Sequence, residues 1–254
     1  MCKDCGCEEA GKQHHTHRHA DGTVHTHVHD ETAHDHAPAT RTVTVEQRVL
    51  AHNDEIAAQN RAWLKARGIV ALNLISSPGT GKTLLLEKTV ERLKARIGVA
   101  VITGDQQTDN DKRRIARTGV PVEQIETHDA CHLDAARVAG VLPVVVRPDT
   151  KLLFIENVGN LVCPAAFDLG ENFQVALLST TEGEDKPQKY PALFSRAGVV
   201  VLTKMDLAPH LEWDLAACRR TIQGVHPGVF VFEVSAKTGA GMDAWCDYLL
   251  RLVG

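Results

Sequence analysis

Aromatic residues, long apolar runs and excess basic charge are all scarce in this sequence of 254 residues. No segment approaches the roughly 18 consecutive apolar residues of a membrane span, so no membrane association is expected. Lysine and arginine number 28 against 32 acidic residues, a balance that argues against nucleic-acid binding. The polar start is unlike a secretory signal. The odd count of seven cysteines fits the reducing cytoplasm, where clustered cysteines bind metal more often than they pair.

The first 40 residues contain no leucine, isoleucine, phenylalanine, tryptophan or tyrosine. They hold three basic and seven acidic residues, which accounts for the whole net charge of −4. A segment with so little apolar surface cannot offset the entropy cost of ordering. We therefore expect residues 1–40 to be a Cys- and His-rich tail that is disordered without metal. Residues 41–254 are expected to form one domain, beginning with an amphipathic helix at about 45–67.

The rest of the chain alternates apolar segments of strand length with segments of helical periodicity. The apolar segments lack polar alternation, as expected of parallel strands covered on both faces. Strands are predicted at 69–75, 99–103, 152–156, 173–179, 198–203 and 229–234, and helices at 82–96, 132–141, 210–223 and 242–252. This order predicts an α/β fold with a doubly wound, mostly parallel sheet.

A phosphate-binding loop is predicted at 76–83, which reads Ser-Ser-Pro-Gly-Thr-Gly-Lys-Thr between a strand and a helix. Serine stands where the usual motif begins with glycine. Backbone N–H groups here can surround phosphates, Lys82 can reach the β and γ oxygens as a catalytic residue, and Thr83 can bind magnesium. A strand–helix turn that ends in Gly-Lys-Thr by chance is the disfavoured alternative. The predicted phosphate contacts are Ser77, Gly79, Thr80, Gly81, Lys82 and Thr83.

Motifs at two later strand ends, Thr-Lys-Met-Asp at 203–206 and Ser-Ala-Lys at 235–237, indicate that the base is guanine. A carboxylate at Asp206 can accept both the N1–H and the exocyclic amine of guanine, a pair that adenine does not offer. Each motif alone could be a surface loop, but in order behind a phosphate loop they predict GTP binding. Thr203 departs from the asparagine of the usual N-K-x-D motif. The predicted base contacts are Thr203, Lys204, Asp206, Ser235, Ala236 and Lys237.

Acidic residues at two strand ends beside the phosphate loop are candidates for holding magnesium. Asp105 and Glu156 can bind the ion directly or through water, and Asp105 can orient the hydrolytic water as a catalytic residue. For Asp109 and Asp111, capping of a helix start is at least as well supported.

The tail offers two sets of metal ligands. Cys2, Cys5 and Cys7, with an α-amine, supply four donors suited to nickel(II); a reactive tail without function is the alternative. The histidines are expected to store nickel at low affinity, with a solvated linker or an expression tag as less favoured interpretations. They are His14, His15, His17, His19, His25, His27, His29, His34 and His36.

A second candidate metal site lies inside the domain. Cys131-His132 and Cys163 combine sulfur with imidazole, which suits zinc(II) or nickel(II). So few ligands per chain favour a site shared between two subunits. From the sequence alone, a buried cysteine and a histidine at a helix start are an equally good interpretation.

These motifs together resemble the HypB family of hydrogenase maturation GTPases, of the SIMIBI class. The resemblance rests on C-x-x-C-G-C, the histidine tract, SSPGTGKT, GDQQTDND, CHLDA, ENVGNLVCP, TKMD and SAK. It implies a GTPase that forms a GTP-dependent homodimer and delivers nickel to the large subunit of [NiFe]-hydrogenase, with the nickel-binding accessory protein HypA as a partner. It also implies high-affinity nickel at the N-terminal cysteines and a nucleotide-coupled nickel or zinc site, at the dimer interface, formed by Cys131, His132 and Cys163.

Three alternatives remain open at this point. A urease-type nickel GTPase carries Cys-Pro-His where this chain reads Cys131-His132-Leu133. A nickel store with secondary GTPase activity and a zinc-handling GTPase are the others. Our hypothesis is a switch in which the γ-phosphate and magnesium order residues 105–111 and 156–159, which lead to the metal ligands.

Overall fold

The computed structural model describes residues 14–18, 24–28, 45–105, 109–127 and 130–254, in two units at 1–43 and 44–254. In the first unit, β1 (His14–Arg18) and β2 (Val24–Val28) form an antiparallel pair, with His15 opposite His27 and His17 opposite His25. Threonine and valine, which favour strands, lie among these histidines. The disorder expected of residues 1–40 without metal stays a prediction.

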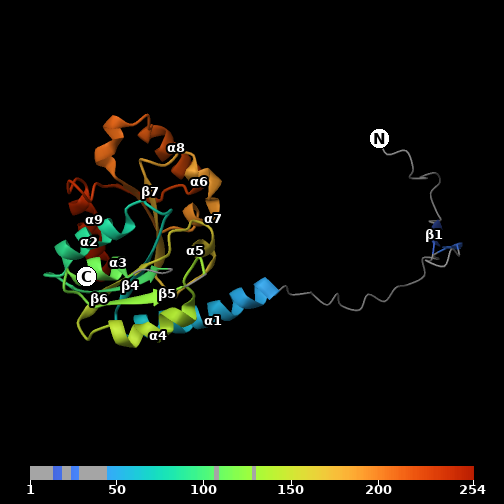
Figure 1. The fold of residues 1–254 in the computed structure, drawn as a ribbon, viewed down its shortest axis with the longest axis horizontal. Coiled ribbons are helices and arrows are strands. Elements are labelled where there is room, and N and C mark those ends of the chain that lie inside the picture. Colours follow the sequence, from blue (N-terminus) through green and yellow to red (C-terminus); the bar gives the residue numbers. More distant parts are fainter. Residues whose placement is uncertain (1–13, 19–23, 29–44, 106–108, 128–129) are drawn as a thin grey trace. The chain divides into compact units, whose positions relative to one another are not determined.

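A parallel sheet forms the centre of the second unit (Figure 1). Its strand order is β5-β4-β6-β3-β7-β8-β9, and every neighbouring pair is parallel. The predicted α/β fold is confirmed, with a wholly rather than mostly parallel sheet. The strands are β3 (Val70–Ile75), β4 (Gly98–Asp105), β5 (Val122–Glu126), β6 (Thr150–Glu156), β7 (Phe173–Ser179), β8 (Val199–Thr203) and β9 (Phe230–Glu233).

Helices cover both faces of this sheet, because its central strands are apolar on both sides. Leu72 and Leu74 of β3 pack in one cluster with Trp245, whereas Ala71 packs in another with Leu64. The helices are α1 (Val45–Lys65), α2 (Lys82–Leu93), α3 (Asn110–Ala116), α4 (Ala135–Val145), α5 (Cys163–Ala166), α6 (Lys186–Lys189), α7 (Pro191–Phe194), η1 (Met205–His210, a 3₁₀ helix), α8 (Leu215–Val225) and α9 (Met242–Val253). Among the described residues, no helix combines the length and apolarity needed to cross a membrane.

Two predicted helix starts were wrong, for the same reason. Helix α4 begins at Ala135 rather than at residue 132, because Asp134 caps it by accepting the backbone N–H of Arg137. Helix α8 begins at Leu215 rather than at residue 210, because Asp214 caps it. His132 therefore lies in a loop before the helix.

Strand β5 and helix α3 were also not predicted from the sequence. Strand β5 is at the edge of the sheet, and only two of its five residues, Val122 and Ile125, are apolar, unlike the mostly apolar central strands. Helix α3 has only seven residues, so its periodicity is weak.

Candidate functional site

The phosphate-binding loop connects the central strand β3 to α2. Gly79 and Gly81 adopt φ values of +75° and +94°, a left-handed conformation that favours glycine. Lys82 is the first residue of α2, and its Nζ lies 3.9 Å from Glu156 Oε1. Above the loop is a cavity of about 420 Å³, lined by residues 77–84 and by Gly104, Asp105, Asp111, Arg114, Asn157, Val158 and Gly159. Backbone N–H groups and Lys82 can bind phosphates there.

Hydrogen bonds from the predicted base-binding residues hold this loop. Thr203, the residue that departs from N-K-x-D, is 4% exposed and its Oγ1 donates to the carbonyl of Thr80 at 2.7 Å. Lys204 Nζ donates to the carbonyl of Gly79 at 2.6 Å. The threonine hydroxyl therefore makes a structural contact with the loop, in addition to lining the base cavity.

Two residues that sequence reasoning missed also hold the loop. Glu182 Oε1 accepts a hydrogen bond from Thr80 Oγ1 at 2.6 Å, and Lys186 Nζ donates to Ser77 Oγ at 2.7 Å. Arg114 was missed as well; it lines the phosphate cavity, and its guanidinium is bonded to Glu87 Oε2 at 2.6 Å. No motif marks these residues, so only the fold identifies them.

A second cavity, of about 220 Å³, adjoins the loop and suits a base. It is lined by Thr80, Gly81, Leu84, Leu85, Thr203, Lys204, Asp206, Leu207, Val234, Ala236 and Lys237. Ser235 is fully buried, and its Oγ donates to Asp206 Oδ1 at 2.6 Å, which fixes the carboxylate. Lys204 has φ +56°, the one positive value at a non-glycine residue in the described ranges. Such strain, about 1–3 kcal/mol, is typical of binding sites.

Glu156 is buried beneath the phosphate cavity. Thr83 Oγ1 donates to its Oε1 at 2.6 Å, while Oε2 has no hydrogen-bond partner among the described residues. Burial raises the pKa of this carboxyl to about 7, against the opposing effects of Lys82 and Thr83. An unpartnered buried carboxylate oxygen beside a threonine hydroxyl fits a magnesium ion, and Asp105 lines the same cavity.

Because the pKa of Glu156 is raised, we expect the stability of the protein without nucleotide and magnesium to depend on pH. Because the folded-state pKa lies above that of the unfolded chain, the stability contribution is present at low pH and is lost as pH rises to about 7. Replacing Glu156 with glutamine should remove this loss. Relative to the parent, the variant's free energy of unfolding in urea should rise by about 2 to 3 kcal/mol between about pH 5 and pH 8.

The matched control is Glu91→Gln, since the Glu91 side chain is 40% exposed and pairs with Lys88 at the surface. Its stability relative to the parent should not vary with pH over this range. A pH-independent difference for Glu156→Gln would contradict a buried carboxyl with a raised pKa.

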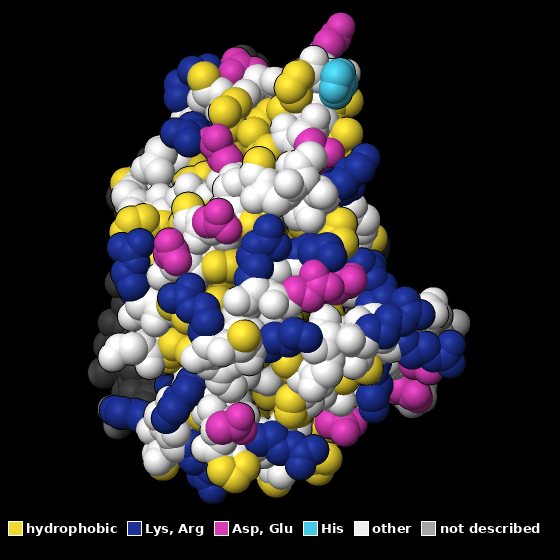
Figure 2. Space-filling model, turned by 90° about the vertical axis from the view of Figure 1, so that its left-hand side faces the viewer, with side chains coloured by type: hydrophobic (Ala, Val, Ile, Leu, Met, Phe, Trp, Pro, Cys, Tyr) yellow, Lys and Arg dark blue, Asp and Glu magenta, His cyan; other side chains and the backbone are white. Residues whose placement is uncertain are grey.

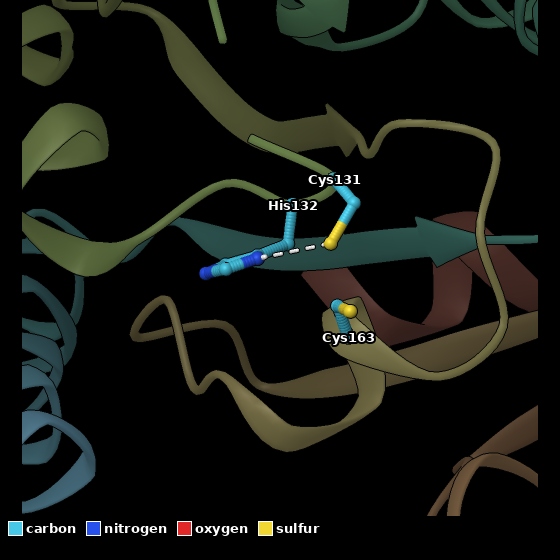
Figure 3. Close-up of side chains that lie close together, drawn as sticks. All are labelled: Cys131, His132 and Cys163. Atoms are coloured by element: carbon cyan, nitrogen blue, oxygen red, sulfur yellow. Dashed lines mark hydrogen bonds between the residues drawn. The ribbon is translucent and has the colours of Figure 1, made fainter. Parts of the chain in front are cut away.

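The fold brings together the side chains of Cys131, His132 and Cys163 (Figure 3). Their ligand atoms all lie within 4.8 Å of one another, and Cys131 Sγ lies 3.7 Å from His132 Nδ1. Cys163 is the first residue of α5. Phe167, just after α5, stacks on the His132 ring, with 3.8 Å between the ring centroids. Loop and helix thus bring together ligands that are 31 or 32 residues apart in sequence.

The chemistry of these three side chains suits a soft metal ion. Burial lowers the pKa of His132, so its imidazole is neutral and has a lone pair to offer near neutral pH. The hydrogen bond between the two thiols, with burial, raises the pKa of Cys131, so a metal ion must displace a proton to bind. Cys218 and Cys246 differ: burial raises their pKa values to about 12 and 11, which fits core positions.

The tail ligands are only partly within the described residues. His14, His15 and His17 belong to β1, and His25 and His27 belong to β2. Outside the described residues lie Cys2, Cys5, Cys7, His19, His29, His34 and His36, together with positions 106–108 of the predicted switch segment.

Comparison with known proteins gives a consistent result along most of the chain. Residues 70–233 match the model of the CobW/HypB/UreG nucleotide-binding domain. The hydrogenase maturation factor HypB of Azotobacter chroococcum mcd 1 is 52% identical over 222 residues, covering 86% of this chain and 73% of that one.

Two solved structures have the same fold. HypB from Archaeoglobus fulgidus has a TM-score of 0.75 at 37% identity, covering 81% of this chain and all of that one. HypB from Helicobacter pylori, solved in complex with nickel, has a TM-score of 0.76 at 34% identity, covering 80% and 95%. With these relatives and a nucleotide site beside a thiol–imidazole cluster, the chain belongs to the HypB family of hydrogenase maturation factors, which are P-loop GTPases.

Proposed function

We propose that this protein is a GTP-hydrolysing nickel metallochaperone that inserts nickel into the large subunit of [NiFe]-hydrogenase. The observation that supports this most is the position of the Cys131, His132 and Cys163 cluster. Cys163 follows residues 157–159, which line the phosphate cavity, by four residues, and Leu133 packs against Gly104 at the end of β4. A cluster of metal-ligand side chains so close to a nucleotide site suits a metal cargo whose release depends on GTP hydrolysis.

In the proposed GTP complex, guanine occupies the 220 Å³ cavity against Asp206, and the phosphates lie at the start of α2. Lys82 binds the β and γ oxygens, and Asp105 orients the attacking water. Thr83, Asp105 and Glu156 would hold magnesium, which neutralises charge developing on the phosphates.

Nickel is the proposed cargo. Three ligands per chain leave coordination positions open, which a second copy in a GTP-dependent homodimer can fill. Zinc(II) fits the same donor set and is the competing ion. Cys2, Cys5 and Cys7 are proposed to bind nickel with high affinity, and the tail histidines to store it.

We propose cytoplasmic protein partners: the nickel-binding accessory protein HypA and the hydrogenase large subunit. Figure 2 shows lysine and arginine side chains interspersed with acidic and apolar ones on one face of the molecule. Mixed charge of this kind supports binding to proteins rather than to nucleic acid, which attracts a continuous basic surface.

Complementation of a deletion strain tests delivery. With limiting nickel, Cys163→Ser should lower hydrogenase activity by about tenfold or more, because it removes one of three ligands of the cluster. Excess nickel should restore much of the activity. Full activity of Cys163→Ser at limiting nickel would overturn a delivery role for the cluster.

The same strain separates delivery from storage, the second candidate function. Nine histidines between residues 14 and 36, some of them paired across β1 and β2, favour some storage capacity. A chain lacking residues 11–37 should still mature hydrogenase but should hold less nickel. Loss of maturation in that deletion would instead assign the tail a role in transfer.

A further inference from the structure

A chain of buried polar side chains runs beneath the nucleotide site, from Asn157 through Asn73 to Glu171. Asn157 Nδ2 donates to Asn73 Oδ1 at 3.2 Å, and Asn73 Nδ2 donates to Glu171 Oε1 at 3.1 Å. The side chains are 1%, 0% and 5% exposed, in that order. Glu171 Oε2 accepts the backbone N–H of Leu169 at 2.7 Å. This network fixes the orientation of the Asn157 amide, because rotating it would leave buried polar atoms unpaired.

The oxygen of the same amide is bonded to the loop that carries two metal ligands. The backbone N–H of Leu133 donates to Asn157 Oδ1 at 3.2 Å, and the N–H of Val158 donates to it at 3.0 Å. Leu133 is fully buried and directly follows Cys131 and His132. One buried amide therefore connects this loop to residues 156–159, the switch segment.

Close packing connects both elements to the phosphate side. A Cβ atom on Gly104 would lie 2.9 Å from Leu133 Cγ, so Leu133 rests directly on the strand end that precedes Asp105. A Cβ atom on Gly159 would lie 3.0 Å from Pro78 in the phosphate loop. Little space separates the switch segment from the phosphate loop, or the ligand loop from the end of β4, so a shift of either segment must be accommodated by its neighbour.

We propose that Asn157 is the positioning residue through which bound nucleotide changes the nickel affinity of the Cys131, His132 and Cys163 cluster. This rests on the proposed function, since it requires GTP and nickel at the two sites described above. When the bound γ-phosphate displaces the switch segment, Asn157 is displaced with it while its amide keeps its orientation. The hydrogen bond from Leu133 to this amide then transmits the displacement to the ligand loop.

The test measures nickel binding by the full chain carrying Cys2→Ser, Cys5→Ser and Cys7→Ser. Near-ultraviolet sulfur-to-nickel charge-transfer absorbance then reports metal at the cluster, to which tail histidines contribute nothing. Nickel affinity is compared with GDP and with a non-hydrolysable GTP analogue. The two values should differ by about fivefold or more in this parent chain and become nearly equal after Asn157→Ala.

Asn53→Ala is the matched control. Asn53 is 5% exposed, and its Oδ1 accepts the backbone N–H of Ala135, two residues beyond Leu133, at 2.9 Å. Its amide nitrogen donates to the carbonyl of Asp168, so it supports the same part of the chain without touching the switch segment. This variant should keep the parent's affinity ratio. An equal loss of the ratio in both variants would mean that general packing, and not Asn157, is responsible.

A measurement on the unsubstituted ligand loop covers the case in which Asn157→Ala fails to fold. Amide hydrogen exchange at Leu133 should differ between the GDP and GTP-analogue states, whereas exchange at Ala135, held by Asn53, should not. Identical exchange at Leu133 in both states, or an Asn157→Ala chain that binds GTP and keeps the parent's ratio, would overturn the proposal. Equal nickel affinities in the parent itself would refute the nucleotide coupling in the proposed function.

Discussion

Replacing Lys82 with alanine is expected to lower the turnover of GTP by about a hundredfold or more, the scale for losing one preorganised charge at a transition state. The Lys82 side chain is 11% exposed at the start of α2. Its ammonium is the cation that the motif places against the β and γ oxygens. Release of inorganic phosphate at saturating GTP measures the loss.

Nickel binding should survive this substitution. Among the described residues, the contacts of the Cys131, His132 and Cys163 cluster do not involve Lys82. Lys88→Ala is the matched control, since Lys88 is on the same helix but pairs at the surface with Glu91 at 2.8 Å. It should keep normal turnover. Turnover within a few-fold of the parent for Lys82→Ala would place the γ-phosphate elsewhere, and parallel loss of nickel binding would show misfolding.

The parts of the site that the sequence predicted are those that local pattern determines. Strand β3, the phosphate loop and the start of α2 are contiguous in sequence. The apolar run of the strand, the glycines of the loop and the Gly-Lys-Thr triplet therefore specify them together. Asp206 and Ala236 follow predicted strands, and parallel strands end at one edge of the sheet. Their shared cavity with Thr80 follows from that geometry.

The parts that could not be predicted depend on contacts between distant segments. Thr203 departs from the asparagine of the usual motif, yet its hydroxyl donates to the loop carbonyl of Thr80, 123 residues earlier. Convergence of Cys131 with Cys163 requires knowing that the loop before α4 lies over the end of β6. The bond between Asn157 and Leu133 has the same origin, because it spans 24 residues between two loops.

Asp206→Asn is expected to exchange guanine preference for xanthine preference. The carboxylate accepts two N–H groups of guanine, whereas an amide accepts one and donates one, which matches the N1–H and C2 carbonyl of xanthine. Ser235 Oγ donates to Asp206 Oδ1 at 2.6 Å, so the corresponding amide oxygen should stay there and the new NH₂ should face the cavity. GTP affinity should fall by about a hundredfold or more, because a buried donor would then oppose a donor.

Competition between GTP and XTP for the same fluorescent analogue measures this exchange. Asp243→Asn is the control, since its side chain is 95% exposed at the start of α9 and should leave GTP preferred. Because Asp206 lines the base cavity and not the phosphate cavity, the Asn variant should hydrolyse bound XTP at close to the parent's rate on GTP. An Asp206→Asn chain that still prefers GTP would exclude this carboxylate as the group that reads the base.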